Sequence, residues 1–266
     1  MEDFSKYNGE GTDLRKLQMR LLDIFIEIDR ICRKHDIKYY LDFGCLIGAI
    51  RHKGFIPWDD DLDVTMPEAD YRRFLEIAPK ELPQNLLLQT PETDPSYRLP
   101  LTKIRDKNSL FITQHEDFTR PYNKGIYVDI FMLTDYPDAP HKPMKFVLKW
   151  IAKTNWFFAT KHDITLKNHL AAISFPIIKW SCMLVWKILC LWPKNQIGYD
   201  IRKDPYCCFF PKEWLYPLEL EEVMFEGIKV FVPKNYDLLL RSIYGDYMTI
   251  PPEEKRVTHI IYVDIQ

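Results

Sequence analysis

The sequence predicts an α+β fold: a mixed sheet of short strands flanked by helices. Residues 12–34 carry apolar side chains at spacings of three and four, the period of an amphipathic helix. Residues 61–66 alternate polar and apolar side chains, as a half-buried strand does. Both patterns occur in the first half of the chain, so helices and strands are expected to share one core.

The individual elements follow in chain order. Thr12 is the expected N-cap of the first helix. A short strand at 37–44 should end in a tight turn at Gly44, and the short helix after it should be closed by Gly54. Pro67 suits the first turn of the helix at 67–82. The remaining predictions are strands at 86–89, 101–105 and 125–131, helical structure at 141–192, a strand pair around 226–227 and a helix at 235–244.

Length and composition restrict the class of protein. The 266 residues can form one domain spanning 1–266, with a helical insertion rich in lysine and tryptophan at about 141–195. The formal net charge of -2 predicts no bulk affinity for nucleic acid. None of the six cysteines forms a C-x-x-C pair, and the acidic, polar start is not expected to be a signal peptide. We therefore expect a reducing, cytosolic setting.

The segment HKGFIPWDDDLDV places four aspartates within five residues. Asp61 and Asp63 would point to one side of a strand, where two like charges either raise a pKa or share a divalent cation. Magnesium suits this arrangement, because it needs one or two carboxylates and takes other ligands from water and phosphates; manganese is the alternative ion. A solvated acidic loop is the commoner fate of a charge run. The neighbouring apolar residues favour the metal site, and an EF-hand is excluded because its glycine and terminal glutamate are missing.

The longer segment LDFGCLIGAIRHKGFIPWDDDLDV resembles the LicD family, which includes bacterial phosphocholine transferases and fukutin-related proteins. The resemblance continues in LTKIRDKNS, GIYVDIF, FEGIKVFVPKNYDLLL and YGDYMTIPPEEKR, and so covers nearly all of the chain outside 141–195. It implies a nucleotidyltransferase-like fold in which a glycine turn precedes a D-x-D strand. The turn would be Gly44, and the metal-binding, catalytic carboxylates would be Asp61, Asp63 and Asp129. Cys45 departs from the small hydroxyl residue usual in this turn, which leaves phosphate contacts there to backbone amides.

The resemblance also implies a reaction. A phospho-alcohol would pass from a CDP-activated donor, such as CDP-choline, to a sugar hydroxyl of a cell-surface glycan precursor, with release of CMP. Phosphoryl transfer needs positive charge around the phosphates, so further contacts with the substrate are expected nearby. The basic candidates are Arg51, His52, Lys103 and Arg105, and Trp58 is an aromatic candidate for substrate binding. For each basic residue, an ordinary surface charge is the alternative, and the sequence fixes neither the alcohol, the acceptor, the number of metal ions nor the oligomeric state.

A choline head group would need aromatic faces for cation–π contact. The aromatic residues near the motifs are Tyr39, Tyr40, Phe55, Trp58 and Phe131, for which core packing is the commoner role. Arg256 and His259 are candidates to close over the acceptor. Two other functions stay open: a D-x-D glycosyltransferase, which would lack the glycine turn and the partner Asp129, and a catalytically silent membrane scaffold, against which the intact carboxylates argue.

The segment 141–194 contrasts with the rest of the chain in charge. It holds nine lysines against one acidic residue, about +8 within a chain of -2, and five of the seven tryptophans. Lys142, Lys145, Lys149 and Lys153 fall on one helix face, the composition of an interfacial helix. We expect peripheral attachment to the inner face of an anionic membrane, where a lipid-linked acceptor would lie; a helical subdomain packed on the core is the alternative. A spanning helix is not favoured, because Lys179, Lys187 and Pro176 interrupt the apolar run.

Overall fold

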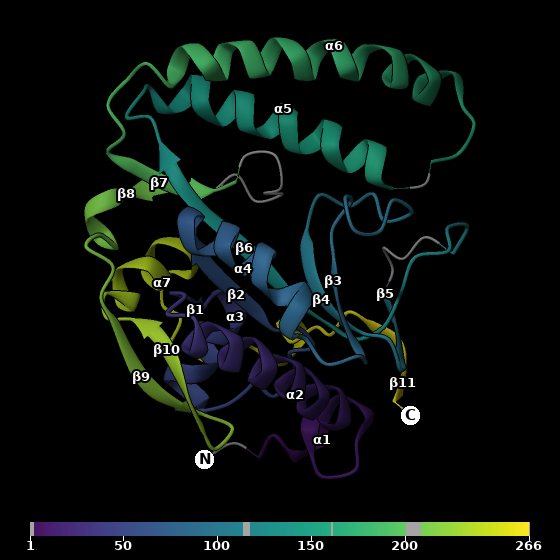
Figure 1. Ribbon diagram of the computed structural model, residues 1–266, viewed down its shortest axis with the longest axis vertical. Helices are drawn as coiled ribbons and strands as arrows, with labels where there is room; N and C mark the ends of the chain where they lie inside the picture. Colours follow the sequence, from purple (N-terminus) through teal and green to yellow (C-terminus); the bar gives the residue numbers. More distant parts are fainter. Residues whose placement is uncertain (1–2, 114–117, 161, 201–208, 266) are drawn as a thin grey trace.

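The structure is a computed structural model that describes residues 3–113, 118–160, 162–200 and 209–265. Its centre is a seven-stranded mixed sheet, shown in Figure 1, with the order β1-β2-β6-β4-β3; β7 pairs with the end of β6, and β8 with β7. β2 and β6 run parallel, and the other pairs are antiparallel. The strands are β1 (Tyr40–Leu41), β2 (Asp63–Pro67), β3 (Leu86–Gln89), β4 (Thr102–Asp106), β6 (Tyr127–Tyr136), β7 (Gln196–Tyr199) and β8 (Phe209–Pro211).

Two long helices pack against this sheet. α2 (Asp13–Lys34) begins where the Thr12 hydroxyl accepts a hydrogen bond from Arg15 N, as predicted for an N-cap. Its apolar stripe is buried, and both α2 and α4 (Glu68–Glu81) contact β6. The remaining helices of this part are α1 (Ser5–Asn8), α3 (Phe43–Ile47) with a π-helical turn at Gly48–His52, α7 (Tyr236–Tyr244), and 3₁₀ turns at Lys212–Trp214 and Glu253–Lys255.

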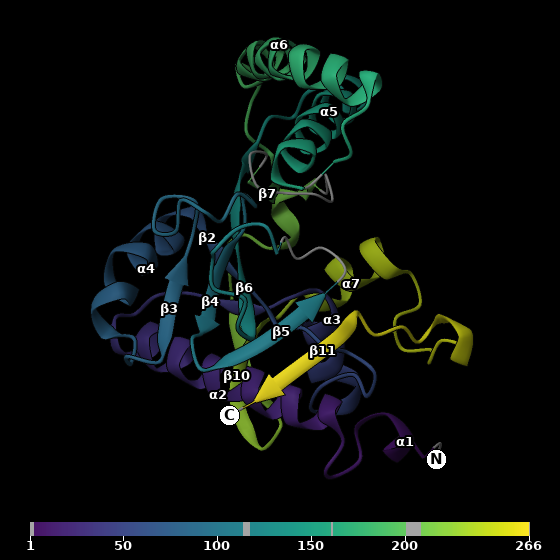
Figure 2. The same cartoon turned by 90° about the vertical axis from the view of Figure 1, so that its right-hand side faces the viewer.

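Two small antiparallel pairs complete the core. β9 (Leu220–Phe225) and β10 (Ile228–Pro233) form the predicted hairpin, whose turn residues Glu226 and Gly227 both have positive φ. β5 (Ser109–Thr113) pairs with β11 (Ile260–Ile265), which brings the C-terminal segment against the middle of the chain, as Figure 2 shows. The strands β5, β7, β8 and β11 were not predicted from sequence; β5 pairs with β11 and β7 with β6 only through long-range contacts.

The segment between β6 and β7 forms two helices, α5 (His141–Ala159) and α6 (Leu166–Leu189). They pack on each other around a second hydrophobic cluster, separate from the main core, that includes Tyr136. α6 is the outermost element in both views (Figures 1 and 2). It continues through Pro176, which the sequence analysis expected to interrupt the apolar run. Among the described residues, α6 alone has the length and composition to cross a membrane, and only 17% of its most apolar window is buried.

The predicted fold class is confirmed: helices flank a mixed sheet. Two local predictions are wrong. Gly44 lies in the first turn of α3 rather than in a tight turn at the end of a strand over 37–44, because the Asp42 carboxylate accepts a hydrogen bond from Phe43 N and starts a helix there. The following helical turn ends at Lys53, in the left-handed conformation, rather than at Gly54.

Candidate active site

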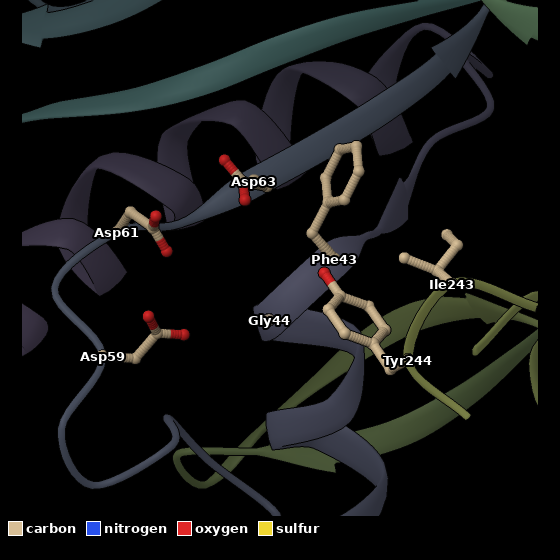
Figure 3. Close-up of a pocket in the computed structure, with 7 residues that line it drawn as sticks. All are labelled: Phe43, Gly44, Asp59, Asp61, Asp63, Ile243 and Tyr244. Carbon is tan, nitrogen blue, oxygen red and sulfur yellow. The ribbon is translucent and has the colours of Figure 1, made fainter. Parts of the chain in front are cut away.

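A pocket of about 320 Å³ lies beside the start of β2. Figure 3 shows three carboxylates, those of Asp59, Asp61 and Asp63, approaching it from the chain that leads into β2. Phe43 and Gly44 of α3 line it as well, with Ile243 and Tyr244 at the end of α7. Residues from three distant parts of the sequence therefore meet at one acidic cavity.

Strand pairing sets the position of the carboxylates. β2 begins at Asp63, whereas the sequence analysis started this strand at 61, so Asp61 lies on the approach to the strand. Asp63 is in register with Asp129 of the parallel strand β6, and Asp129 N donates a hydrogen bond of 3.0 Å to Leu62 O. Asp129 thus lies beside Asp63 on the neighbouring strand, outside the residues that line the pocket.

Gly44 allows the chain carrying Asp59 to approach α3. A Cβ atom at this position would lie 2.6 Å from Asp59 Oδ2, which is closer than real Cβ contacts. Asp42 fixes the start of α3 from within the core, since its carboxylate accepts hydrogen bonds of 2.7 Å from both Thr65 Oγ1 and Tyr199 Oη. The glycine predicted from sequence is therefore placed at the pocket, and its role is close packing against a carboxylate.

Burial and mutual repulsion disfavour the ionised form of the three carboxylates in the pocket. Burial, followed by the like charges of neighbouring aspartates, raises the pKa of Asp59 and Asp63 well above the ordinary range. The same causes raise the pKa of Asp61 to about 6. Asp59 and Asp61 remain accessible from the pocket although protein surrounds them. A cation in this cavity would relieve the repulsion.

Lys103 supplies a positive charge beside Asp129. It is buried on β4, in register with Asp129, and donates a hydrogen bond of 3.2 Å to Asp129 Oδ2. Its Nζ also lies 2.9 Å from Asp129 Oδ1, an ion-pair contact without hydrogen-bond geometry. Lys103 is thus paired with Asp129, the third predicted carboxylate, next to the pocket.

The donor chemistry fits a hard divalent cation. The pocket offers carboxylate oxygens, and Asp129 Oδ1 is a buried oxygen that makes no hydrogen bond within the described ranges. In the same ranges, no three Asp, Glu, His or Cys side chains are close enough to form a complete ligand set. These residues therefore suit an ion such as magnesium, which takes one or two carboxylates and completes its shell with water and phosphate oxygens.

The fourth aspartate of the run turns away from the pocket. Asp60 is buried and accepts hydrogen bonds of 2.6 Å from His259 N and 3.1 Å from His259 Nδ1. Arg256 stacks over Trp58, with 4.9 Å between Cζ and the ring centroid. Arg256 and His259 were predicted to close over the acceptor. In the structure they hold the C-terminal segment against the acidic loop.

The other predicted substrate contacts lie outside the pocket lining. Arg51 donates to the backbone oxygens of Tyr247 and Thr249 and to His52 Nε2. Trp58 is buried, and its ring packs edge-on to Phe4 and His52. Arg51, His52 and Trp58 thus support the walls around the acidic loop.

Arg105 is fully buried and donates to Gln89 Oε1 at 2.6 Å and to Gly125 O at 2.8 Å. These contacts join β4 to the end of β3 and to the residue segment that precedes β6. The structure therefore buries both residues on β4, with Lys103 paired to Asp129 and Arg105 bonded to Gln89 and Gly125.

The aromatic residues proposed for a choline cage are core residues. Each is at most 8% exposed, and none lines the pocket: Tyr39, Tyr40, Phe55, Trp58 and Phe131. The pocket instead has Phe43 and Tyr244 as aromatic neighbours of the carboxylates (Figure 3). Asp59 was missed although it belongs to the aspartate run, whereas nothing in the local pattern around Tyr244 marked it.

Within the described residues the mixed sheet has one parallel strand pair, β2 and β6, and its aspartates lie in or beside the pocket, the arrangement expected of the nucleotidyltransferase-like class. Comparison with known families agrees: residues 36–175 match the family described as "LicD/FKTN/FKRP, nucleotidyltransferase domain". The chain belongs to the LicD family, and it is a transferase of that family.

Individual relatives extend this match. The chain is 31% identical over 271 residues to "Lipopolysaccharide cholinephosphotransferase LicD" of Haemophilus influenzae, covering 93% of this chain and 96% of that protein. It is 30% identical over 137 residues to an uncharacterized protein of Rickettsia prowazekii, covering 52% of this chain and 46% of that protein. The first similarity spans both the carboxylates and the helical insertion.

Proposed function

We propose that this protein transfers a phospho-alcohol, in the first instance phosphocholine, from a CDP-activated donor to a sugar hydroxyl of a cell-surface glycan precursor such as lipopolysaccharide. The observation that carries the proposal is the pocket that gathers Asp59, Asp61 and Asp63 beside Asp129 and Lys103. The name of the Haemophilus influenzae relative supports phosphocholine and lipopolysaccharide.

The reaction breaks one bond and forms one at the phosphorus that carries the alcohol. The acceptor hydroxyl oxygen bonds to this phosphorus, the bond to the bridging oxygen of the diphosphate breaks, and CMP leaves with the bonding electrons. The hydroxyl proton must pass to a base. The nearby carboxylates are the candidates, and we keep the predicted assignment of Asp129, which its strand pairing and Lys103 hold in place.

A bound magnesium ion would supply positive charge against the diphosphate and lower the pKa of the attacking hydroxyl. Asp61 and Asp63 would hold it, and Asp59, whose carboxylate lies next to that of Asp61 in the same cavity, adds a carboxylate that was not predicted from sequence. Lys103 neutralises Asp129, so the acidic strands carry less repulsion toward an anionic donor.

The pocket also offers a surface for the alcohol. Tyr244, 43% exposed at the end of α7, lines the pocket with the carboxylates (Figure 3), and an aromatic face attracts a quaternary ammonium group. Choline would gain this contact, whereas glycerol or ribitol would not. This aromatic contact supports the proposal of a cationic alcohol on the donor.

The test is a CMP-release assay with magnesium and a sugar acceptor, run across CDP-choline, CDP-ethanolamine, CDP-glycerol and CDP-ribitol. We expect release to be fastest with CDP-choline and to disappear when the metal is chelated. Manganese should restore activity to the chelated enzyme, since it accepts the same oxygen ligands.

Other outcomes would replace the proposal. Release of UDP from a nucleotide-sugar, without CMP release from any CDP-alcohol, would identify a glycosyltransferase instead. Absence of both activities, together with no metal binding by calorimetry, would identify a catalytically silent scaffold.

A further inference from the structure

The side of α6 that faces away from α5 is an exposed apolar face along the whole helix. Its large side chains recur every three or four residues and so form one continuous stripe, which we call the outer face of α6: Leu166, Leu170, Ile173, Ile177, Trp180, Leu184 and Ile188. Ile173 is 69% exposed, Ile177 64% and Trp180 67%. Monomeric soluble proteins rarely expose an apolar patch of this length, which marks an interaction surface.

The side of α6 that faces α5 is already buried. Cys182, Trp186 and Leu189 are buried in the cluster that α6 shares with α5. Lys179, which would interrupt the apolar run, turns toward α5 and donates a hydrogen bond of 2.6 Å to Asn155 Oδ1. The outer face therefore carries few charges. The charges that remain belong to basic residues at its edges.

The charges around the outer face select the partner. α6 contains no acidic residue, and the segment 141–194 carries nine lysines against one aspartate. The α5 lysines predicted to form a stripe (Lys142, Lys145, Lys149 and Lys153) are all exposed, and Lys153 lies over Phe175 of α6, 5.8 Å from the ring centroid. Two copies meeting through α6 would bring two strongly positive surfaces together, whereas an anionic lipid surface complements them.

The packing of α5 decides how α6 would meet the lipid. α5 lies along α6 and connects it to β6, with its own lysines exposed. A spanning α6 would draw those lysines into hydrocarbon or lose its contacts with α5, both of which are costly. A helix lying in the plane of the interface keeps them, with its apolar side in the acyl region and its basic edges at the head groups.

We propose that α6 docks the protein onto an anionic phospholipid surface, lying in the membrane plane with its outer face inserted and α5 as its support. This relocates the contact predicted from sequence, because the lysine stripe of α5 flanks the insertion while α6 makes it. The docking is independent of the proposed reaction, and it would bring the pocket to acceptors that are carried on lipids.

The test is flotation of the full-length protein with sealed vesicles, without nucleotide or metal, so that a negative result leaves the phosphotransfer proposal untouched. We expect flotation with vesicles of phosphatidylethanolamine and phosphatidylglycerol, less flotation at high salt, and little with phosphatidylcholine alone. The double variant Ile173→Glu/Ile177→Glu should lower the partition coefficient by about tenfold or more. The matched control Met224→Glu/Ile261→Glu, which adds the same charge at exposed apolar positions elsewhere, should float like the unaltered protein.

Orientation and the competing partner are tested separately. Trp180 fluorescence, defined as the signal lost in Trp180→Phe, should be quenched more by lipids brominated near the head group than by lipids brominated near the chain end. Stronger quenching from the chain end would overturn the in-plane helix in favour of a spanning one. No flotation, equal loss in the control variant, or a stable dimer in sedimentation that dissociates in Ile173→Glu/Ile177→Glu would overturn lipid docking, and the dimer would assign the outer face to a second copy.

Discussion

The run of four aspartates divides into two functions at the residue scale. Asp59, Asp61 and Asp63 enter the pocket, whereas Asp60 is buried and holds the backbone and ring of His259. Neighbouring residues of one type therefore have opposite expected effects when they are replaced. Loss of a pocket carboxylate removes repulsion, and loss of Asp60 removes hydrogen bonds on which the C-terminal segment depends.

Asp63→Asn is expected to lower the rate of phosphotransfer by a factor of about 10² or more. The metal-free protein should keep its melting temperature or gain stability. The physical reason is that asparagine keeps the shape of the buried side chain and removes a charge disfavoured by burial and by four neighbouring aspartates. The magnesium-induced rise in melting temperature should disappear. CMP release and calorimetric melting measure the two effects.

Asp13→Asn is the matched control, because Asp13 is exposed and forms a surface ion pair with Lys16. It should leave both the activity and the response to magnesium unchanged. If Asp63→Asn instead unfolds the metal-free protein, Asp63 has a structural role, and the site assignment fails.

The pH dependence of metal binding follows from Asp61, whose pKa is raised to about 6 from an ordinary value of 3.8. A raised pKa means that the folded state binds this proton more tightly than the unfolded chain does, so this group favours folding as the pH falls below about 6. Above that pH the carboxylate is ionised at a cost that a cation can offset. Protons are therefore expected to compete with the proposed magnesium ion for the pocket.

We expect the magnesium-induced rise in melting temperature to be full at about pH 7.5 and to be largely lost at about pH 5. Comparing melting with and without magnesium at each pH removes the contribution of distant groups. A rise that is the same at both pH values would show that the ion does not bind at these carboxylates.

At the scale of elements, the β9–β10 turn holds the loop that leads to the aspartates. Glu226 accepts hydrogen bonds from Phe55 N at 3.0 Å and from Arg15 Nη2 at 2.7 Å, and Glu226 N donates to Lys53 O. A Cβ atom on Gly54 would lie 2.3 Å from Glu226 Oε1, so only glycine allows this approach. The turn, α2 and the acidic loop are thus joined at one partly buried carboxylate.

Glu226→Ala is expected to lower the free energy of unfolding by about 2–3 kcal/mol, because it leaves the Phe55 amide and the Arg15 guanidinium without this acceptor. Magnesium affinity should fall as well, since the loop before Asp59 loses its support. Denaturant unfolding and calorimetry measure the two effects.

The comparison for this variant is Glu219→Ala on the edge of the same hairpin, where the carboxylate is exposed and pairs only with Lys234. Its cost should stay within about 0.5 kcal/mol. Equal costs at the two positions would show that Glu226 is an ordinary surface charge.

At the scale of the whole molecule, the helical pair is inserted into a strand pair that closes without it. Tyr136 at the end of β6 is in register with Gln196 at the start of β7, and Asp138 N donates to Pro193 O. α5 and α6 bury their side chains in their own cluster, apart from the core that surrounds the pocket. The sheet and the pocket should therefore be separable from the insertion.

Replacing residues 138–194 by a short glycine-containing turn should leave a folded protein that still responds to magnesium and releases CMP with a soluble sugar acceptor. Vesicle flotation should be lost, because the outer face of α6 is gone. Thermal melting, CMP release and flotation of this variant are compared with those of the complete chain. Loss of cooperative melting would instead make the helical pair part of the folding core.

Local patterns were sufficient for the elements whose evidence lies within a few residues. The stripe of α2, the alternation of β2, the β9–β10 turn and the acidic run were all predicted from sequence, because their periods and turn residues are local properties. The resemblance to the LicD family added Asp129, which strand pairing places beside Asp63.

Only the tertiary structure decided which side chains of these patterns meet. Asp60 turns toward His259, 199 residues away, and Gly44 makes room for Asp59, so the run alone could not assign its members to the pocket. Arg105 and the predicted cage aromatics are buried because neighbouring strands cover them. α6 exposes an apolar face because α5 covers only one of its sides, and a helical period shows a stripe without showing whether a partner covers it.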